Sequence, residues 1–420
     1  MKPLIAAVIL SELAALVLLP KAGQTLWTGD VLTPRPVGAL SQPLRLAEGP
    51  TNASGDDFAF RLKNELLARE KNGNLCFSPL SMQVCLSLLL NGAAGGSIDP
   101  LRSTLSIGSA TLEEVNEGNR VLLASLAGAN FTTGNSIWLR SSVSPKSDFT
   151  HRLQDSYNAE FFAVPDFDSS TYNRIDGWVS LHTKGRIKKL FDAGPRQAVA
   201  VLVNTITFDG EWKVPFDPKQ TRLEKFTTGE GAAVPVEMMH TGYYFDYARD
   251  DDAEAVRLPY SDGRYAMICI LPRPETNASD LAKRLDAEGF RGLMKKLKKT
   301  YVEVSLPRFS FSSSFDMVPP LGAMGLAPLY EAIDLSGISQ DLATGLSLTT
   351  IVQKTWIKVD EKGTQAGAAS GLEVELSVPP FFLANRPFLF AIVQENTGAI
   401  LFVGMVQHPS NQNAPVVGLG

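Results

Sequence analysis

The order of apolar and polar residues predicts helices in the first third of this chain. In FAFRLKNELLARE, Phe58, Leu62, Leu66 and Leu67 recur at the spacing that places side chains on one helix face, and a cap-like Ser-Gly-Asp-Asp cluster precedes them. A continuous apolar stretch follows FSPLS, and TLEEVNEGNRVLLASLAG is the next helical segment. We therefore expect the folded body to open with helices.

Strand patterns dominate the rest of the chain. Several segments are rich in β-branched and aromatic residues and are bounded by turn formers. They include AVAVLVNTITF, EAVRLPY, RYAMICILP, YVEVSLPRFSFS, KTWIKVD, PFLFAIVQ and AILFVGMVQ. Because helices and strands come in blocks rather than in strict alternation, the pattern predicts an α+β fold and not a doubly wound parallel sheet.

The N-terminal segment differs in character from this body. A lysine precedes an apolar run from Leu4 to Leu19, which is the chemistry of an export signal. Pro20 and Lys21 stand where small residues are expected at a cleavage site, so both removal and retention as an anchor stay open. The run is somewhat shorter than the ~20 residues that span a bilayer. We expect a secreted or extracytoplasmic protein, tethered to a membrane if this segment is retained, and we expect the segment to lie outside the fold.

Composition shifts divide the chain into four parts. Residues 1–22 are the signal peptide or membrane anchor, and residues 23–55 form a flexible linker rich in Pro, Gly, Ser and Thr. Residues 56–409 show no internal repeat and form a single domain, and residues 410–420 form a C-terminal tail.

Charge and cysteine usage exclude several classes of function. The formal net charge of −5 offers no broad cationic surface for a phosphate backbone, so nucleic acid is not an expected partner. The three cysteines, Cys76, Cys85 and Cys269, lie in apolar runs without metal-ligand spacing. We interpret them as small buried hydrophobic side chains, and we expect no metal site and no cofactor.

No local motif of an enzyme is visible. The sequence contains no G-x-S-x-G elbow, no G-x-x-x-x-G-K-[ST] loop, no G-x-G-x-x-G after a strand and no H-E-x-x-H. A catalytic site assembled from distant residues would escape this search. The expectation is a protein that is not an enzyme.

The most informative segment is EKGTQAGAASGLEVELSVPPFFLANRP, from Glu361 to Pro387, which lies between two convincing strands. A connection of this length is uncommon in a compact domain. It begins with small residues from Gly363 to Gly371. It continues with apolar residues at Leu372 to Leu376 that alternate with two glutamates, which is the pattern of a half-buried strand.

A strand pattern at the place of a loop suggests a segment with two states. Continuing the same parity backwards places Thr364, Ala366, Ala368 and Ser370 on the apolar face, and all four are small enough to slide between strands. Gln365 and the two glutamates would then face solvent. The alternative is a surface loop whose residues alternate by coincidence, and composition alone leaves both interpretations open.

Seven dispersed segments together resemble the serpin family. They are EKGTQAGAAS, RPFLFAIVQENTGAILFVGMVQHP, NLCFSPLS, WVSLHTKGRIKKLF, LVNTITFDGEWKVPF, VEMMH and VEVSLPRF. The resemblance covers residues 56–409 and implies a serpin fold with a five-stranded central sheet, two further sheets and eight or nine helices. It also implies an exposed reactive-centre loop above the central sheet.

The resemblance also lends roles to particular residues. Ser78, Ser81 and Asn204 match the shutter, where the central sheet parts, and Gln353 stands where many serpins have a histidine. Because glutamine cannot be protonated, a pH-sensitive opening of the shutter is in doubt. Trp212 matches the breach, where loop insertion begins. The hinge of the loop is matched by Glu361, Gly363, Thr364, Gln365, Ala366, Ala368, Ala369 and Ser370.

As the family works, a serine protease cleaves the loop and is trapped as an acyl-enzyme while the cleaved loop inserts into the sheet. The downstream Ser-Val-Pro-Pro favours a reactive bond between Leu376 and Ser377. Counting from the hinge gives the alternative Ser377-Val378 bond. Leucine before the bond suits an apolar specificity pocket, so the expected targets are chymotrypsin-like proteases. If Ser377 stands before the bond instead, the expected targets are subtilisin-like or elastase-like proteases.

Two alternatives accompany this expectation. A non-inhibitory serpin acting as a carrier or chaperone would have a loop that is only a substrate. Lys295, Lys296, Lys298 and Lys299 form a basic cluster that either binds a polyanion or is a solvated helix face. We expect a monomer.

Overall fold

The computed structural model describes residues 8–20, 50–69, 73–128, 130–191, 194–362 and 379–409. It confirms the α+β class, with helices concentrated in the first half and strands in the second. The reactive-bond residues Leu376, Ser377 and Val378 lie outside the described residues, as do all the hinge residues from Gly363 to Ser370.

The helices are α1 (Pro50–Arg69), α2 (Pro79–Gly92), α3 (Ile98–Leu105), α4 (Leu112–Leu126), α5 (Ser147–Tyr157), α6 (Ser169–His182), α7 (Ala278–Arg284), α8 (Ala287–Lys296), α9 (Val318–Leu321) and α10 (Pro328–Glu331). Three of the helices, α1, α2 and α4, lie where the sequence predicted helical segments. Helix α1 starts at Pro50, ahead of the expected cap cluster, and buries Phe58, Leu62, Leu66 and Leu67 as predicted. The described residues contain ten α-helices, two of them only four residues long, where the resemblance implied eight or nine.

The strands form two hydrogen-bonded systems. They are β1 (Val8–Pro20), β2 (Leu75–Phe77), β3 (Phe131–Arg140), β4 (Ala159–Val164), β5 (Ala200–Gly210), β6 (Arg222–Thr227), β7 (Ala233–Arg249), β8 (Ala253–Pro259), β9 (Tyr265–Pro272), β10 (Lys298–Pro307), β11 (Phe309–Asp316), β12 (Leu346–Val359), β13 (Phe381–Leu383), β14 (Phe388–Gln394) and β15 (Ile400–Val406). The central sheet has the order β11-β12-β1-β5-β3-β4. The second has the order β13-β10-β7-β8-β9-β14-β15-β2, with β6 paired to β7. Because the long β7 pairs with β6, β10 and β8, the two further sheets implied by the resemblance are joined into one path.

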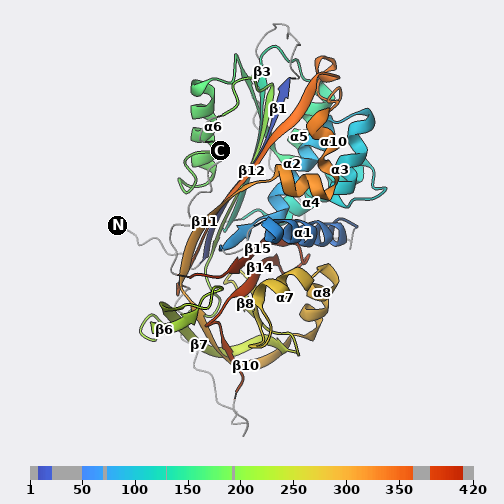
Figure 1. The fold of residues 1–420 in the computed structure, drawn as a ribbon. Helices are drawn as coiled ribbons and strands as arrows, with labels where there is room; N and C mark the ends of the chain where they lie inside the picture. The colour runs from blue at the N-terminus through green and yellow to red at the C-terminus, as the bar shows by residue number, and fades with distance from the viewer. Residues whose placement is uncertain are drawn as a thin grey trace.

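The two faces of the central sheet are covered by different helices (Figure 1). Helix α6 packs on one face, while α2 and the group around α4 and α5 cover the other. Helix α2 starts at the N-cap Ser78 with proline in its first turn, and nearly all of its residues are buried. The apolar side chains of this largely buried helix therefore form part of the main core beneath the sheet.

One element departs from the expectations. The apolar N-terminal segment was expected outside the fold, yet Val8–Pro20 forms β1, a strand in the middle of the central sheet. The sheet consequently has six strands rather than five. The physical reason is that the second half of β1, the unbroken apolar run from Leu13 to Leu19, suits a strand covered on both sides by helices. Whether this segment also directs export stays a prediction.

Candidate functional site

The four residues matched to the shutter meet at the centre of the molecule, where α2 touches the central sheet. Ser78 caps α2 by accepting a hydrogen bond of 3.1 Å at Oγ from the backbone N–H of Ser81. The hydroxyl of Ser81 donates to Oδ1 of Asn204 on β5, whose Nδ2 donates to Oδ1 of Asn135 on β3 at 2.8 Å. All of these side chains are buried. They form a chain of hydrogen bonds from α2 across two strands.

Gln353 completes the shutter from β12. Its Nε2 donates a hydrogen bond of 2.8 Å to the backbone carbonyl of Ser78. The amide is fully buried, so the bond satisfies a donor that would otherwise be costly to bury. Because glutamine has no ionisable group, this hydrogen bond does not depend on protonation of the side chain. The start of α2 is thus bonded to the strands on both sides of β1.

Trp212, the residue that the resemblance matches to the breach, is buried just after the end of β5. The indole ring of Trp212 stacks on the phenol ring of Tyr260, with ring centroids 4.8 Å apart. Only 1% of the surface of Trp212 is exposed. The indole Nε1 donates a hydrogen bond of 3.0 Å to the backbone carbonyl of Asp360, immediately after β12. A tryptophan is suited to this position because its ring packs while its N–H satisfies a buried carbonyl. Trp212 thereby holds the end of β12 next to the end of β5.

The first hinge residue, Glu361, is held by an ion pair. Arg308, between β10 and β11, approaches both carboxylate oxygens, with Nε at 2.7 Å and Nη2 at 2.6 Å. Thr221 Oγ1 donates to the same carboxylate at 2.5 Å. Burial on its own raises the pKa of Glu361, but these hydrogen bonds outweigh it and the pKa falls below its ordinary value. The base of the loop is therefore anchored as an ionised carboxylate.

A cavity of about 470 Å³ lies beside this ion pair. Its lining includes Glu237, Arg308, Phe309, Lys358 and Glu361. Arg308 also donates to Glu237 Oε2 at 2.8 Å, so its guanidinium joins two carboxylates of the lining.

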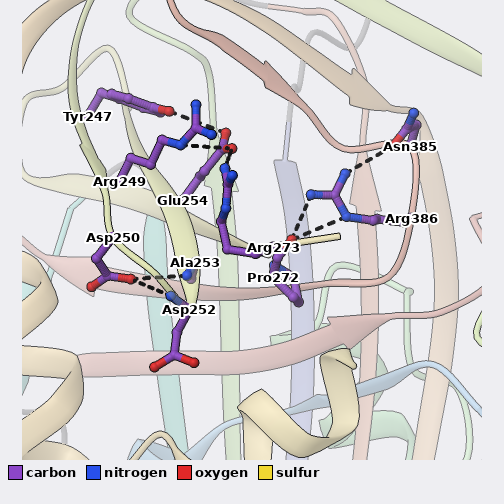
Figure 2. A network of polar contacts seen from close by, with 10 residues as sticks. All are labelled: Tyr247, Arg249, Asp250, Asp252, Ala253, Glu254, Pro272, Arg273, Asn385 and Arg386. Atoms are coloured by element: carbon purple, nitrogen blue, oxygen red, sulfur yellow. Dashed lines mark hydrogen bonds and ion pairs between the residues drawn. The ribbon is translucent and has the colours of Figure 1, made fainter. Parts of the chain in front are cut away.

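The downstream end of the loop is fixed by Arg386, the first residue of the C-terminal signature (Figure 2). Its guanidinium donates twice to the backbone carbonyl of Pro272, from Nη2 at 2.6 Å and from Nε at 3.2 Å. In the same network, the buried carboxylate of Glu254 accepts a hydrogen bond of 2.6 Å from Arg273 and one of 3.3 Å from Tyr247. Both ends of the segment between Glu361 and Arg386 are thus tied to the folded body.

The basic cluster is exposed and partly neutralised. Lys295 and Lys296 end α8, and Lys298 and Lys299 begin β10, with all four side chains on the surface. Lys296 lies 2.8 Å from Asp250, and that hydrogen bond is the main cause of a raised pKa for its ammonium. The neighbouring acidic residues weigh against a polyanion at this position.

The cysteines and other potential metal ligands also lie in the described part of the chain. Cys76, Cys85 and Cys269 are buried, as predicted. Among the described residues, no group of three or more potential metal ligands comes together. None of the helices in the described ranges has both the length and the apolar character that a membrane crossing requires.

The sequence analysis missed three contributors to this site: Arg308, Thr221 and Asn135. Arg308 stands inside VEVSLPRF, one of the segments that carried the resemblance, but no local pattern pairs it with a glutamate far away along the chain. Asn135 is a polar residue within a predominantly buried strand, which is a signal that would have drawn attention to it.

A sequence model of the family described as Serpin (serine protease inhibitor) matches residues 53–409. The chain belongs to this family. It is 31% identical over 388 residues to Serpin A3-5 of Bos taurus, covering 90% of this chain and 93% of that protein. It is 30% identical over 382 residues to an uncharacterised serpin-like protein of Thermococcus kodakarensis, covering 87% of each.

Two solved structures extend the comparison. Tengpin, a thermophilic serpin in the native state, is similar with a TM-score of 0.76 and 26% identity, covering 88% of this chain and 96% of that one. Human thyroxine-binding globulin, solved as a complex with its hormone, gives the same TM-score and identity over 86% and 98%. The serpin fold expected from the sequence is confirmed.

Proposed function

We propose that this protein inhibits a serine protease by trapping it as an acyl-enzyme while the cleaved loop inserts between β5 and β12. The observation that carries this proposal is the composition of the loop. Residues 363–371 contain no proline and no charged side chain, so nothing in this stretch opposes burial between two strands. Family membership supports serine proteases as targets.

The proposed reactive bond is Leu376-Ser377, with Ser377-Val378 as the alternative. A leucine side chain fills an apolar specificity pocket, which favours chymotrypsin-like, subtilisin-like or elastase-like targets over trypsin-like ones. The protein would act as a monomer outside the cytoplasm, and it would not turn over a substrate of its own. Binding of a polyanion by the basic cluster stays a weaker proposal, because Lys296 is already paired with Asp250.

A carrier function is the second candidate. The likeness to thyroxine-binding globulin favours it, since that protein was solved with a bound hormone. In a carrier, the loop would be cleaved without trapping the protease.

The experiment incubates the protein with chymotrypsin, subtilisin and elastase, with trypsin as the comparison protease. Products are separated on denaturing gels, and the mass of the released C-terminal peptide is measured by mass spectrometry. A complex that survives denaturation supports the trap, and a peptide beginning at Ser377 rather than Val378 identifies the bond. The same incubation is made with a chain that begins at Gly23, because the N-terminal strand β1 lies between β5 and β12 in the full chain. Clean cleavage of both chains by every protease, without such a complex, would contradict inhibition and favour the carrier.

A further inference from the structure

The slot into which a cleaved loop would insert is occupied by the N-terminal segment of the chain. Strand β1 pairs with β5 on one side and with β12 on the other, antiparallel to both. At its start Val8 lies opposite Val359 and Gly210, next to the breach. The loop leaves β12 at Glu361, so a loop that folded back into the sheet would run antiparallel to β12 as β1 does. Strand β1 therefore has the direction of an inserted loop.

The packing of β1 is that of an integral strand. Ala14, Leu16 and Leu18 belong to the main core beneath the sheet, whereas Ala15 and Val17 belong to the cluster under α6, and all five are fully buried. The strand is thus covered on both faces. Tight packing of this kind leaves no room for a second strand at the same position.

The shutter accommodates β1 at an alanine. In the register of the sheet, Ala14 lies opposite both Asn204 and Gln353, the two shutter residues on the flanking strands. Cys85 of α2 places Sγ 3.8 Å from the backbone oxygen of Ala14 and 3.9 Å from that of Leu202. The close approach of α2 to β1 at Ala14 requires a small side chain on the strand. The alanine-rich loop also has small side chains.

We propose that residues 8–20 act as an internal plug that fills the insertion slot, so that the chain traps a protease only after this segment leaves the sheet. This inference rests on the proposed function. β5 and β12 each have one set of backbone donors and acceptors on the side facing the slot. Because β1 and an inserted loop would need the same hydrogen-bonding groups, only one of them can occupy the slot at a time. Because the same segment has the chemistry of an export signal, its removal on export would convert a plugged chain into an active one.

The test compares the full chain with a chain that begins at Gly23. Two full-length variants accompany them: Ala14→Glu, which places a charge at the buried crossing, and Ala124→Glu, the same substitution at an exposed position of α4. Amide hydrogen exchange of residues 8–20 reports occupancy of the slot. The rise in melting temperature after the loop is nicked reports insertion, whether or not a protease is trapped. Denaturation-resistant complexes report inhibition.

We expect protected amides at residues 8–20 in the full chain and in Ala124→Glu, and little rise in melting temperature when either is nicked. The shortened chain and Ala14→Glu should gain thermal stability on nicking and should form at least tenfold more complex. If Ala14→Glu fails to fold, the shortened chain carries the comparison alone.

Rapid exchange of residues 8–20 in the full chain would overturn the plug, as would equal thermal gains on nicking in the full and shortened chains. If the shortened chain alone gains stability on nicking but forms no complex, the plug stands and the proposed inhibitory function fails. No gain in either chain overturns both.

Discussion

Arg308 and Glu361 form a two-point ion pair that joins the strand pair β10–β11 to the base of the loop, with nitrogen to oxygen distances of 2.7 and 2.6 Å. Glu361 is 3% exposed, so the pair keeps a buried carboxylate ionised at the point where the loop leaves β12. In the proposed mechanism insertion would begin here, because Glu361 directly follows β12, the strand beside which the loop would lie.

Replacing Arg308 with glutamine should destabilise the protein. The change removes the positive charge beside Glu361 and leaves that carboxylate buried with only Thr221, at a cost of about 2–4 kcal/mol in the free energy of unfolding. Urea denaturation measures this cost. The matched control is Arg222→Gln, whose partner Glu224 lies in an exposed pair, and it should cost less than about 1 kcal/mol. Equal costs for the two variants would contradict an anchoring role for Arg308.

Replacing Ser81 with alanine should weaken the shutter without removing the cap of α2. The variant loses the hydroxyl that donates to Asn204, while the Ser78 side chain still accepts from the backbone of residue 81. The expected loss of unfolding free energy is about 1–3 kcal/mol, because Asn204 keeps a buried acceptor without its donor. Ser312→Ala, at an exposed position on β11, serves as the control. A loss no larger than that of the control would exclude an energetic role for the Ser81–Asn204 bond.

The docking of α6 on the central sheet should depend on pH through His182. Burial alone lowers the pKa of His182, but hydrogen bonds to Glu160 and to the carbonyl of Trp178 outweigh it and raise the pKa above its ordinary value. A raised pKa means that the stabilisation is complete below the unfolded pKa of about 6.5 and is lost as pH rises through the folded value.

The measurement compares the wild type with His182→Gln by urea denaturation at about pH 5.5 and 8.5, on either side of that range. The difference in unfolding free energy should be larger at the acidic pH. A difference that is constant, or larger at the alkaline pH, would show that the imidazolium does not contribute.

In a chain that begins at Gly23, changing Leu376 to arginine should redirect the proposed inhibition toward trypsin-like proteases. If Leu376 fills the specificity pocket of the target, the substitution should lower the rate of complex formation with chymotrypsin and raise it with trypsin, each at least tenfold. The two rates are obtained by measuring the residual activity of each protease at successive times after it is mixed with the protein. The same change at Ser377 distinguishes the two candidate bonds, since only the residue directly before the cleaved bond should switch the specificity.

Much of the fold was predictable from local pattern. The helical spacing in α1 gave the correct buried residues, and the predicted strand segments correspond to β5, β8, β9, β10, β11, β12, β14 and β15. Two differ clearly in extent: β12 begins at Leu346, well before the predicted KTWIKVD segment, and the single segment YVEVSLPRFSFS forms the two strands β10 and β11. These predictions succeed because the side-chain period of an element is set by its own backbone geometry. The loop was recognisable for a related reason, since its alternation and small residues conflict with its place between two strands.

What the sequence by itself determined is therefore the fold class and the family, while the position of the loop stays a prediction. Tertiary structure alone decided that Arg308 neutralises Glu361, that Asn135 extends the shutter, and that the apolar N-terminal segment lies inside the central sheet. An apolar run in a sequence indicates only that the segment will be buried away from water. Whether a membrane, an export pathway or the gap between β5 and β12 supplies the apolar surroundings depends on which partner strands the rest of the chain presents.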